Sequence, residues 1–258
     1  MTGQVLLAVD GPIALVTLSH PGKLNAMSRA MWHTLREIFT GLQRRSDVRC
    51  VLLRGEGAGF CAGGDISEYS GFRFDEAALR HFHENEVWGG LKAMLDCDVP
   101  IVAQIEGACM GAGMEIASCC DLRLASVSAK FGAPIAKLGF PMAPREAALV
   151  MRAAGELTTR EMLLAAAVLD AATLLQRGFL NGTYPDGEVA VQASLAAGRI
   201  IRLAPTAARL NKQTFRAIAQ EERKQFATDL IANTYAYADS AEHREGVTAF
   251  VEKRPPQF

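Results

Sequence analysis

The sequence predicts an α/β fold that ends in a helical region. Two glycine-rich turns, at 55–65 and 107–113, each follow a short apolar strand and lead toward a helical segment. From about residue 157 onward, nearly every segment has the pattern of a helix. The chain should therefore alternate strands and helices first and close with a helical appendage.

The first 54 residues predict a hairpin, a helix and a strand. The apolar segments 5–9 and 13–18 flank an Asp-Gly-Pro turn, which is typical of antiparallel strands joined tightly. Ser28 can cap a helix that runs to about residue 45 with one apolar face. That face carries Met31, Leu35, Ile38, Phe39 and Leu42. The strand CVLLR follows at 50–54.

The middle of the chain repeats the order of strand, glycine turn, helix and strand. Residues 55–65 hold five glycines and little polarity, and Asp75 predicts the start of a long helix to about residue 94. IVAQIEG at 101–107 is a second buried strand. The stretch 107–121 then passes from glycines to an apolar helix, and DLRLA at 121–125 is a further strand.

The C-terminal part predicts helices with short breaks. They cover 159–168, 171–177 closed by Gly178, 188–203 stopped before Pro205, 206–225 and 227–250. No sequence repeat of 20 to 50 residues and no low-complexity segment is visible. We therefore divide the chain into a core, 1–195, and a helical region, 196–258.

Composition favours a globular protein that acts on a small molecule. The 258 residues are 50% hydrophobic, and their net charge of −1 comes from 27 basic and 28 acidic residues spread along the chain. This balance argues against nucleic-acid or membrane partners. The start lacks a basic segment and the longest apolar run, 162–169, is too short to span a bilayer, so we expect a cytoplasmic protein.

The six cysteines predict buried, reduced thiols rather than a metal site or disulfides. They form no C-x-x-C pair, have no histidine at ligand spacing, and stand mostly in apolar stretches. We expect no metal and no separate cofactor.

The two glycine turns point to an anionic ligand group. A helix that begins after such a turn directs unpaired N–H groups at whatever lies in front of it. Neither turn has the phosphate-loop pattern, and GEGAGF departs from the dinucleotide-binding pattern at its last position. An oxyanion held by two backbone N–H donors from different segments is the alternative that remains.

Five stretches carry a resemblance to a known family. HPGKLNAM (20–27), FCAGGDI (60–66), GACMGAGMEIASCCD (107–121), FGAP with LGFP (131–141), and the terminal EGVTAFVEKRPPQF resemble the crotonase superfamily, the enoyl-CoA hydratase/isomerase fold. The match runs nearly end to end, in order and with compatible spacing. It implies a spiral of ββα units, a C-terminal helical trimerisation region, and assembly as a homotrimer or dimer of trimers.

The resemblance also implies a site for an acyl-CoA. Gly64 and Ala112 match the two oxyanion N–H donors that hold the thioester oxygen. The matching CoA-contact positions are Lys23, Leu24, Ala26, Ala62, Asp65, Ile66, Phe250 and Lys253. Coenzyme A would be part of the substrate.

Glu115 matches one of the two glutamates that hydratases use to handle the protons of water. A first-turn position favours its charge and apolar neighbours oppose it, which suits a general base. The second glutamate position is Ile135, and a further acid position of some relatives is Ala143. Five nearby groups remain as substitutes, each expected to be a surface or capping group: Glu68, Tyr69, His81, His83 and Glu146.

Three interpretations of function stay open. The first is an enzyme of oxyanion-stabilised enolate chemistry, nominally hydration of a 2-enoyl-CoA with Glu115 as sole acid/base. The second is a double-bond isomerase or another crotonase reaction, such as thioester hydrolysis or decarboxylation. The third is a non-catalytic acyl-CoA-binding protein, which Ile135 favours. The unusual PMAPREAA segment at 141–148 borders the expected acyl pocket and predicts an unusual substrate.

Overall fold

The computed structural model describes residues 2–219 and, beyond them, positions 241, 245, 252, 254 and 257. The strands in this part are β1 Gln4–Asp10, β2 Ile13–Ser19, β3 Cys50–Gly55, β4 Ile101–Ile105, β5 Ala108–Met110, β6 Leu122–Ser126, β7 Lys130–Gly132, β8 Val168–Asp170 and β9 Gly182–Tyr184. The α-helices are α1 Arg29–Gln43, α2 Glu76–His81, α3 Trp88–Asp96, α4 Ala112–Ser118, α5 Pro144–Ala154, α6 Glu156–Leu164, α7 Ala171–Gln176, α8 Val189–Ile200 and α9 Pro205–Ala219. The predicted helix 227–250 lies outside the described residues.

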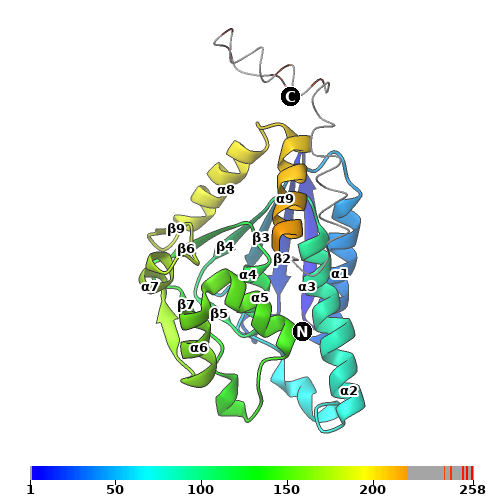
Figure 1. Ribbon diagram of the computed structural model, residues 1–258, viewed down its shortest axis with the longest axis vertical. Coiled ribbons are helices and arrows are strands. Elements are labelled where there is room, and N and C mark those ends of the chain that lie inside the picture. Colours follow the sequence, from blue (N-terminus) through cyan, green and yellow to red (C-terminus); the bar gives the residue numbers. More distant parts are fainter. Residues whose placement is uncertain are drawn as a thin grey trace.

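The strands form two sheets, which confirms the predicted α/β class. The larger sheet has the order β1-β2-β3-β4-β6-β9, with an antiparallel hairpin at its β1 edge and parallel pairs elsewhere (Figure 1). The smaller sheet has the order β5-β7-β8. The chain crosses between the sheets as β4-β5-α4 and again as β6-β7-α5, so ββα units recur as predicted.

Both faces of the larger sheet are covered, which explains why its central strands are apolar throughout. Val51 and Leu53 of β3 face the main core beside helices α1, α3 and α4. Cys50 and Leu52 of the same strand face a smaller core closed by the alanine-rich side of α8. All six cysteines are buried and free, as the sequence predicts.

The predicted helix from Asp75 exists, but it contains a wider turn. Asp75 caps α2 by accepting a hydrogen bond from the N–H of Ala78, and α3 ends at Asp96. Between these helices, Phe82–Val87 is π-helical (η2). A π-turn holds one more residue than the 3.6-residue period anticipates, so it redirects the side chains that follow.

The prediction of a helix over 159–168 is wrong at its end, because Val168 begins β8. The strand β9 lies in the break between the predicted helices 171–177 and 188–203. Each strand has three residues, too few to display an alternating pattern. The helix α5 was also missed, because Pro144 stands at its first turn, where proline is tolerated.

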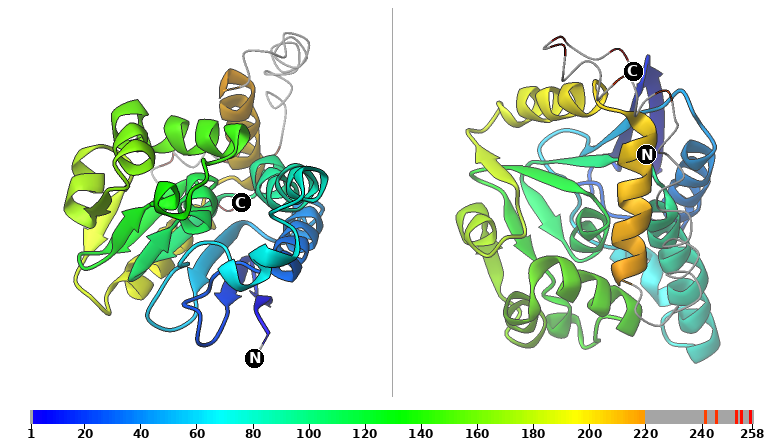
Figure 2. Two further views of the ribbon diagram at one scale, coloured as in Figure 1. Left: turned by 90° about the horizontal axis from the view of Figure 1, so that it is seen from below. Right: turned by 45° about the horizontal axis from the view of Figure 1, so that its top comes forward.

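Helix α9 follows α8 and packs beside α3 (Figures 1 and 2). Buried Asp98 accepts hydrogen bonds from Gln213 and Arg216 of α9, and Arg216 also donates to the carbonyl of Leu95. The predicted boundary at 195/196 falls inside α8 and stays a prediction. None of the described helices is long and apolar enough to cross a membrane.

Candidate active site

The two glycine turns meet because the strands before them are neighbours. Strands β3 and β4 pair in parallel, so their carboxyl ends lie at the same edge of the sheet. Beyond this edge Cys61 and Cys109 form a parallel bridge. The N–H groups of Phe60 and Cys61 donate to the carbonyl of Ala108, and that of Met110 donates to Cys61. Segments more than forty residues apart in sequence thus form one rigid wall.

This wall carries two backbone N–H groups that are free to bind a ligand. Next to Gly64, the carbonyl of Gly63 and the N–H of Asp65 bond to Met27, which turns the N–H of Gly64 the opposite way. Ala112 is the first residue of α4, a position whose N–H has no partner within a helix. Neither group has a hydrogen-bond acceptor among the described residues, and both residues line one cavity.

Two positions in the wall require glycine. Gly111, just before α4, has φ +47° and ψ −108°, a conformation that a side chain would strain. At Gly64 an added Cβ would lie 2.3 Å from the hydroxyl oxygen of Tyr69. The glycines therefore set the backbone path that exposes the two N–H groups.

The cavity in front of this wall measures about 360 Å³. Most of its lining is apolar, from Trp32, Ala62, Ile66, Phe82, Val87, Met110, Pro134, Ile135, Leu138, Phe140, Pro141, Met142 and Ala143. Its polar side chains are Tyr69, Arg73, His83, Glu115 and Lys137. An apolar pocket with a few convergent polar groups is the usual form of a small-molecule site.

Glu115 stands in the first turn of α4, as predicted, and borders the cavity. Burial and, to a lesser extent, the nearby charge of Glu146 together raise the pKa of its carboxyl to about 8. At neutral pH a carboxyl with this pKa is mostly protonated but lies close to its midpoint. Such a group can both give and take a proton.

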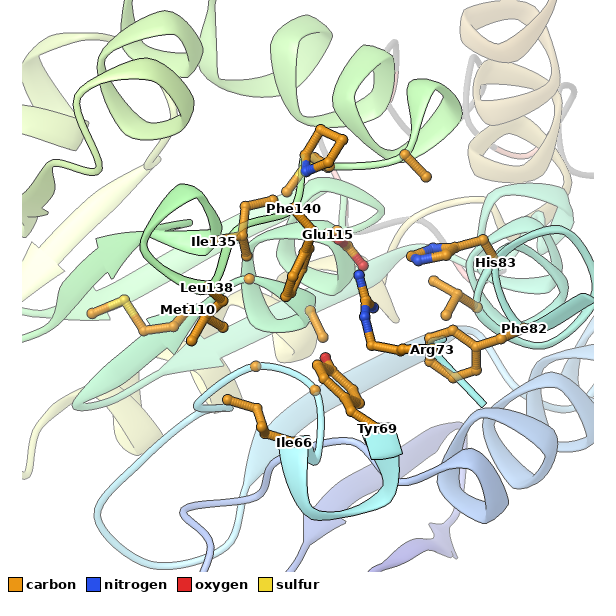
Figure 3. A pocket seen from close by; sticks show the side chains of 18 of the residues that line it. Ile66, Tyr69, Arg73, Phe82, His83, Met110, Glu115, Ile135, Leu138 and Phe140 are labelled. Carbon is orange, nitrogen blue, oxygen red and sulfur yellow. The ribbon is translucent and has the colours of Figure 1, made fainter. Parts of the chain in front are cut away.

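Glu146 and His83 correct the expectation that they are surface or capping groups. Glu146, in the first turn of α5, is only 2% exposed, and its carboxylate lies 3.2 Å from Nδ1 of His83. His83 comes from the π-helical segment and lines the cavity. Figure 3 shows His83 directed toward the end of the cavity where Glu115 lies. The structure thus gathers three titratable groups from three separate elements.

The two positions at which the family resemblance implies acids, Ile135 and Ala143, also border this cavity. Ile135 begins the 3-10 turn η3, Ile135–Leu138, and Ala143 precedes α5. Neither side chain can carry a proton. Glu146, one turn further along the chain than Ala143, lies near enough to Glu115 for its charge to raise the pKa of Glu115.

The other three alternatives have different places. Glu68 accepts a hydrogen bond from the N–H of Arg29, which is the capping role expected of it. His81 is exposed and lies 3.7 Å from Glu86, away from the cavity lining. Tyr69 lies in the cavity wall over Gly64, and burial raises the pKa of its hydroxyl.

Arg73 is a cavity residue that no sequence pattern singles out. It follows the 3-10 helix η1, Ile66–Gly71, and its guanidinium carbon lies 3.7 Å from the centre of the Phe140 ring and 4.6 Å from that of Tyr69. Burial lowers the pKa of this guanidinium. Figure 3 shows the group extending toward Glu115 and His83.

The residues expected to contact CoA lie together beside the wall that the two glycine turns form. Lys23 Nζ binds both carboxylate oxygens of Asp65, at 2.9 and 2.7 Å, and Ser67 Oγ at 2.7 Å. The N–H of Ala62 donates to the carbonyl of Leu24. This pairing fixes the loop after β2 against the first glycine turn.

The remaining predicted contacts differ in exposure. Leu24 and Ile66 are exposed apolar side chains, at 57% and 55%, which leaves them open to a ligand. Ala26 is buried, and its carbonyl oxygen lies 2.6 Å from Nδ1 of His20. Phe250 and Lys253 lie outside the described residues. No cluster of three metal-ligating side chains occurs within the part that the structure describes.

The sequence and the fold of this chain resemble those of known proteins. The sequence model of the enoyl-CoA hydratase/isomerase family matches residues 9–258. The chain belongs to the enoyl-CoA hydratase/isomerase family. Membership of this family implies acyl-CoA thioesters as substrates. The predicted fold agrees with this membership.

Relatives and solved structures resemble the chain over nearly its whole length. A short-chain-enoyl-CoA hydratase of Clostridium acetobutylicum is 29% identical and covers 97% of this chain and 95% of its own. A crystal structure of an enoyl-CoA hydratase/carnithine racemase from Magnetospirillum magneticum has 32% identity and a TM-score of 0.92, and covers 100% of this chain and 96% of that chain. These likenesses establish the fold and the family.

Proposed function

We propose that the protein catalyses hydration of a 2-enoyl-CoA through an oxyanion-stabilised enolate, with Glu115 as the acid/base. The observation that carries this proposal is the position of Glu115, which borders the same cavity as two N–H groups without acceptors, at Gly64 and Ala112. Donors placed in this way lower the barrier to any reaction that develops negative charge on a carbonyl oxygen.

The steps balance with one carboxylate. Ionised Glu115 takes a proton from water while the water oxygen bonds to C3, and the electrons of the double bond move onto the thioester oxygen. The N–H groups of Gly64 and Ala112 stabilise that oxyanion. The enolate then collapses as C2 takes a proton from Glu115, which leaves the 3-hydroxyacyl-CoA and an ionised carboxylate.

His83, held by Glu146, is the group best placed to assist Glu115. The dyad lies at the same end of the cavity, and an imidazole with a carboxylate on one nitrogen can exchange a proton at the other. It would orient the attacking water, a task that Ile135 cannot perform. We therefore assign His83 a positioning role and Glu146 the task of fixing the imidazole.

Double-bond isomerisation is the second candidate, and the observation that favours it is that Glu115 is the one carboxyl among the described residues that line the cavity. Moving a proton between C4 and C2 requires one base and an enolate but no bound water. Glu115 and the two N–H groups satisfy that requirement, and an apolar group at Ile135 would help to keep water out.

Two incubations test these reactions. Purified protein is mixed separately with 2-enoyl-CoAs of short, long and aromatic chains and with a 3-enoyl-CoA, and the products are analysed by mass spectrometry and by NMR, which locates the double bond. A gain of one water supports hydration, whereas a shifted double bond at constant mass supports isomerisation. If the unmodified protein, like Glu115→Gln, turns over none of these substrates, both proposed reactions are overturned. Acyl-CoA binding is then the function that remains.

We propose a trimer or a dimer of trimers as the assembly, as the family resemblance implies. Apolar side chains that the described part leaves exposed on α8 and α9 support it, among them Val191, Leu195, Phe215 and Ile218. The double variant Phe215→Ser/Ile218→Ser should form an assembly of lower mass than the unmodified protein, as measured by light scattering after size-exclusion chromatography. A monomer for the unmodified protein would contradict the proposal.

A further inference from the structure

Arg73 brings a positive charge into a cavity that otherwise suits an uncharged acyl chain. No hydrogen bond or ion pair to its guanidinium occurs within the part of the chain that the structure describes. A half-buried cation without a counter-ion loses hydration and gains little in return. A ligand that supplies the missing negative charge would compensate for this loss.

The surroundings of Arg73 hold the group in place without neutralising it. The Phe140 and Tyr69 rings, 6.0 Å apart and inclined at 71° to each other, both contact the guanidinium carbon. Cation–π contacts of this kind use no N–H donor of the guanidinium in a hydrogen bond, so these groups stay available to a ligand. They can bind the two oxygens of a carboxylate at once.

The carboxyl groups near Arg73 are committed elsewhere. Asp75 caps α2, and Glu146 contacts His83. Glu115 borders the same cavity, but burial raises the pKa of its carboxyl to about 8, so at neutral pH it is mainly uncharged. Lys137 adds a second positive charge at the exposed rim. The cavity is therefore net positive before the ligand binds.

We propose that Arg73 binds a carboxylate on the acyl chain, so that the substrate is the CoA thioester of a dicarboxylic acid. The proposal rests on the proposed function only in taking this cavity as the acyl site. The thioester oxygen would lie at Gly64 and Ala112, and the second carboxylate would reach Arg73 past Glu115. Simple fatty acyl chains would leave the guanidinium without an anion and bind more weakly.

Binding of saturated thioesters tests the proposal, because hydration cannot occur and turnover is not read. Calorimetric titrations compare glutaryl-CoA with its terminal primary amide, which has the same shape without the charge. The unmodified protein should bind glutaryl-CoA about ten- to a hundredfold more tightly, the range expected for a charged hydrogen-bonded pair. Equal affinities would overturn the proposal without any variant.

Substitutions then assign the preference to a residue. Arg73→Gln should abolish it, and Arg73→Lys should keep part of it, because lysine offers a charge without the bidentate edge. Arg80→Gln is the matched control, since Arg80 is exposed and pairs only with Glu76 among the described residues, and it should keep the full preference. A preference that survives in Arg73→Gln would contradict the assignment.

Coenzyme A without an acyl group separates this role from phosphate binding. Arg73→Gln should bind free CoA as the unmodified protein does, and an equal loss for CoA and glutaryl-CoA would mean that Arg73 contacts CoA itself. A preference for glutaryl-CoA in a protein that hydrates no enoyl-CoA would overturn the proposed reaction and support the role of Arg73. Hydration without the preference would do the reverse.

Discussion

The cavity has two sides that hold their polar groups by different means. One side carries Gly64 and Ala112, and the other carries Arg73 and His83, with Glu146 in contact with His83. On the first side the active groups are backbone N–H donors, fixed by the parallel pairing of β3 with β4 and by the bridge between Cys61 and Cys109. On the second side they are side chains that come from a loop, a π-helical turn and the start of α5.

This difference separates the kind of reaction from the choice of substrate. Backbone donors on rigid strands stabilise an oxyanion whatever acyl group is attached. Side chains on loops and helix ends can change without disturbing that wall, so under the proposed function they would determine where protons move and which acyl chain fits. Glu115 lies where the two sides meet, because its backbone belongs to the oxyanion turn and its pKa depends on Glu146.

Removing the acid/base where the sides meet should have the largest effect. Glu115→Gln keeps the size of the side chain but cannot exchange protons, so kcat for the proposed reaction should fall by about 10²–10⁴. Initial rates with the best enoyl-CoA measure this loss. Glu156→Gln, an exposed side chain in the first turn of α6, is the matched control and should keep the full rate. Retention of activity in Glu115→Gln would assign the proton transfer to another group.

Removing one backbone donor should cost almost as much. Ala112→Pro deletes the N–H at the first position of α4, where proline is tolerated in a helix, so the fold should persist. We expect kcat to fall by about 10²–10³. Glu156→Pro makes the same change at the first position of α6, also after a glycine of positive φ, and should leave the rate unchanged. Equal losses in both variants would refute the role of Ala112 as a donor.

The raised pKa of Glu115 should also appear in stability. Below about pH 4.5 the carboxyl is protonated in both states, and between pH 4.5 and about 8 the unfolded chain ionises first. Wild-type stability should therefore fall relative to Glu115→Gln by up to roughly 1.4 kcal/mol per pH unit across this window, and level off above it. Urea unfolding at pH 5, 6.5 and 8 measures the difference. A constant difference would mean that the pKa is ordinary.

The smallest effect concerns the link between the two sides. Glu146→Gln removes a negative charge near Glu115, so the pKa of Glu115 should drop and the rise of kcat/KM with pH should move to lower pH by less than about one unit. Glu84→Gln removes an exposed carboxylate paired with Arg145 and should not move the profile. A shift to higher pH in Glu146→Gln would reverse the assigned interaction.

The sequence predicted the first side of the cavity more fully than the second. Glycines at fixed places after apolar strands leave few backbone paths, so the two turns, the helix after the second turn and the place of Glu115 followed from local patterns. Arg73 stands in a segment with no periodic signal. His83 and Glu146 are 63 residues apart, and their meeting depends on a π-turn and on a helix that begins at Pro144. No local pattern encodes such a contact.

Exchange at C2 of a saturated acyl-CoA in deuterated water tests the central claim most directly, because it requires the enolate but no hydration. We expect the protein to incorporate deuterium at C2, detected by mass spectrometry and NMR. Glu115→Gln and Ala112→Pro should lose this exchange, whereas Glu156→Pro should retain it. Exchange by Glu115→Gln at the rate of the unmodified protein would contradict the account.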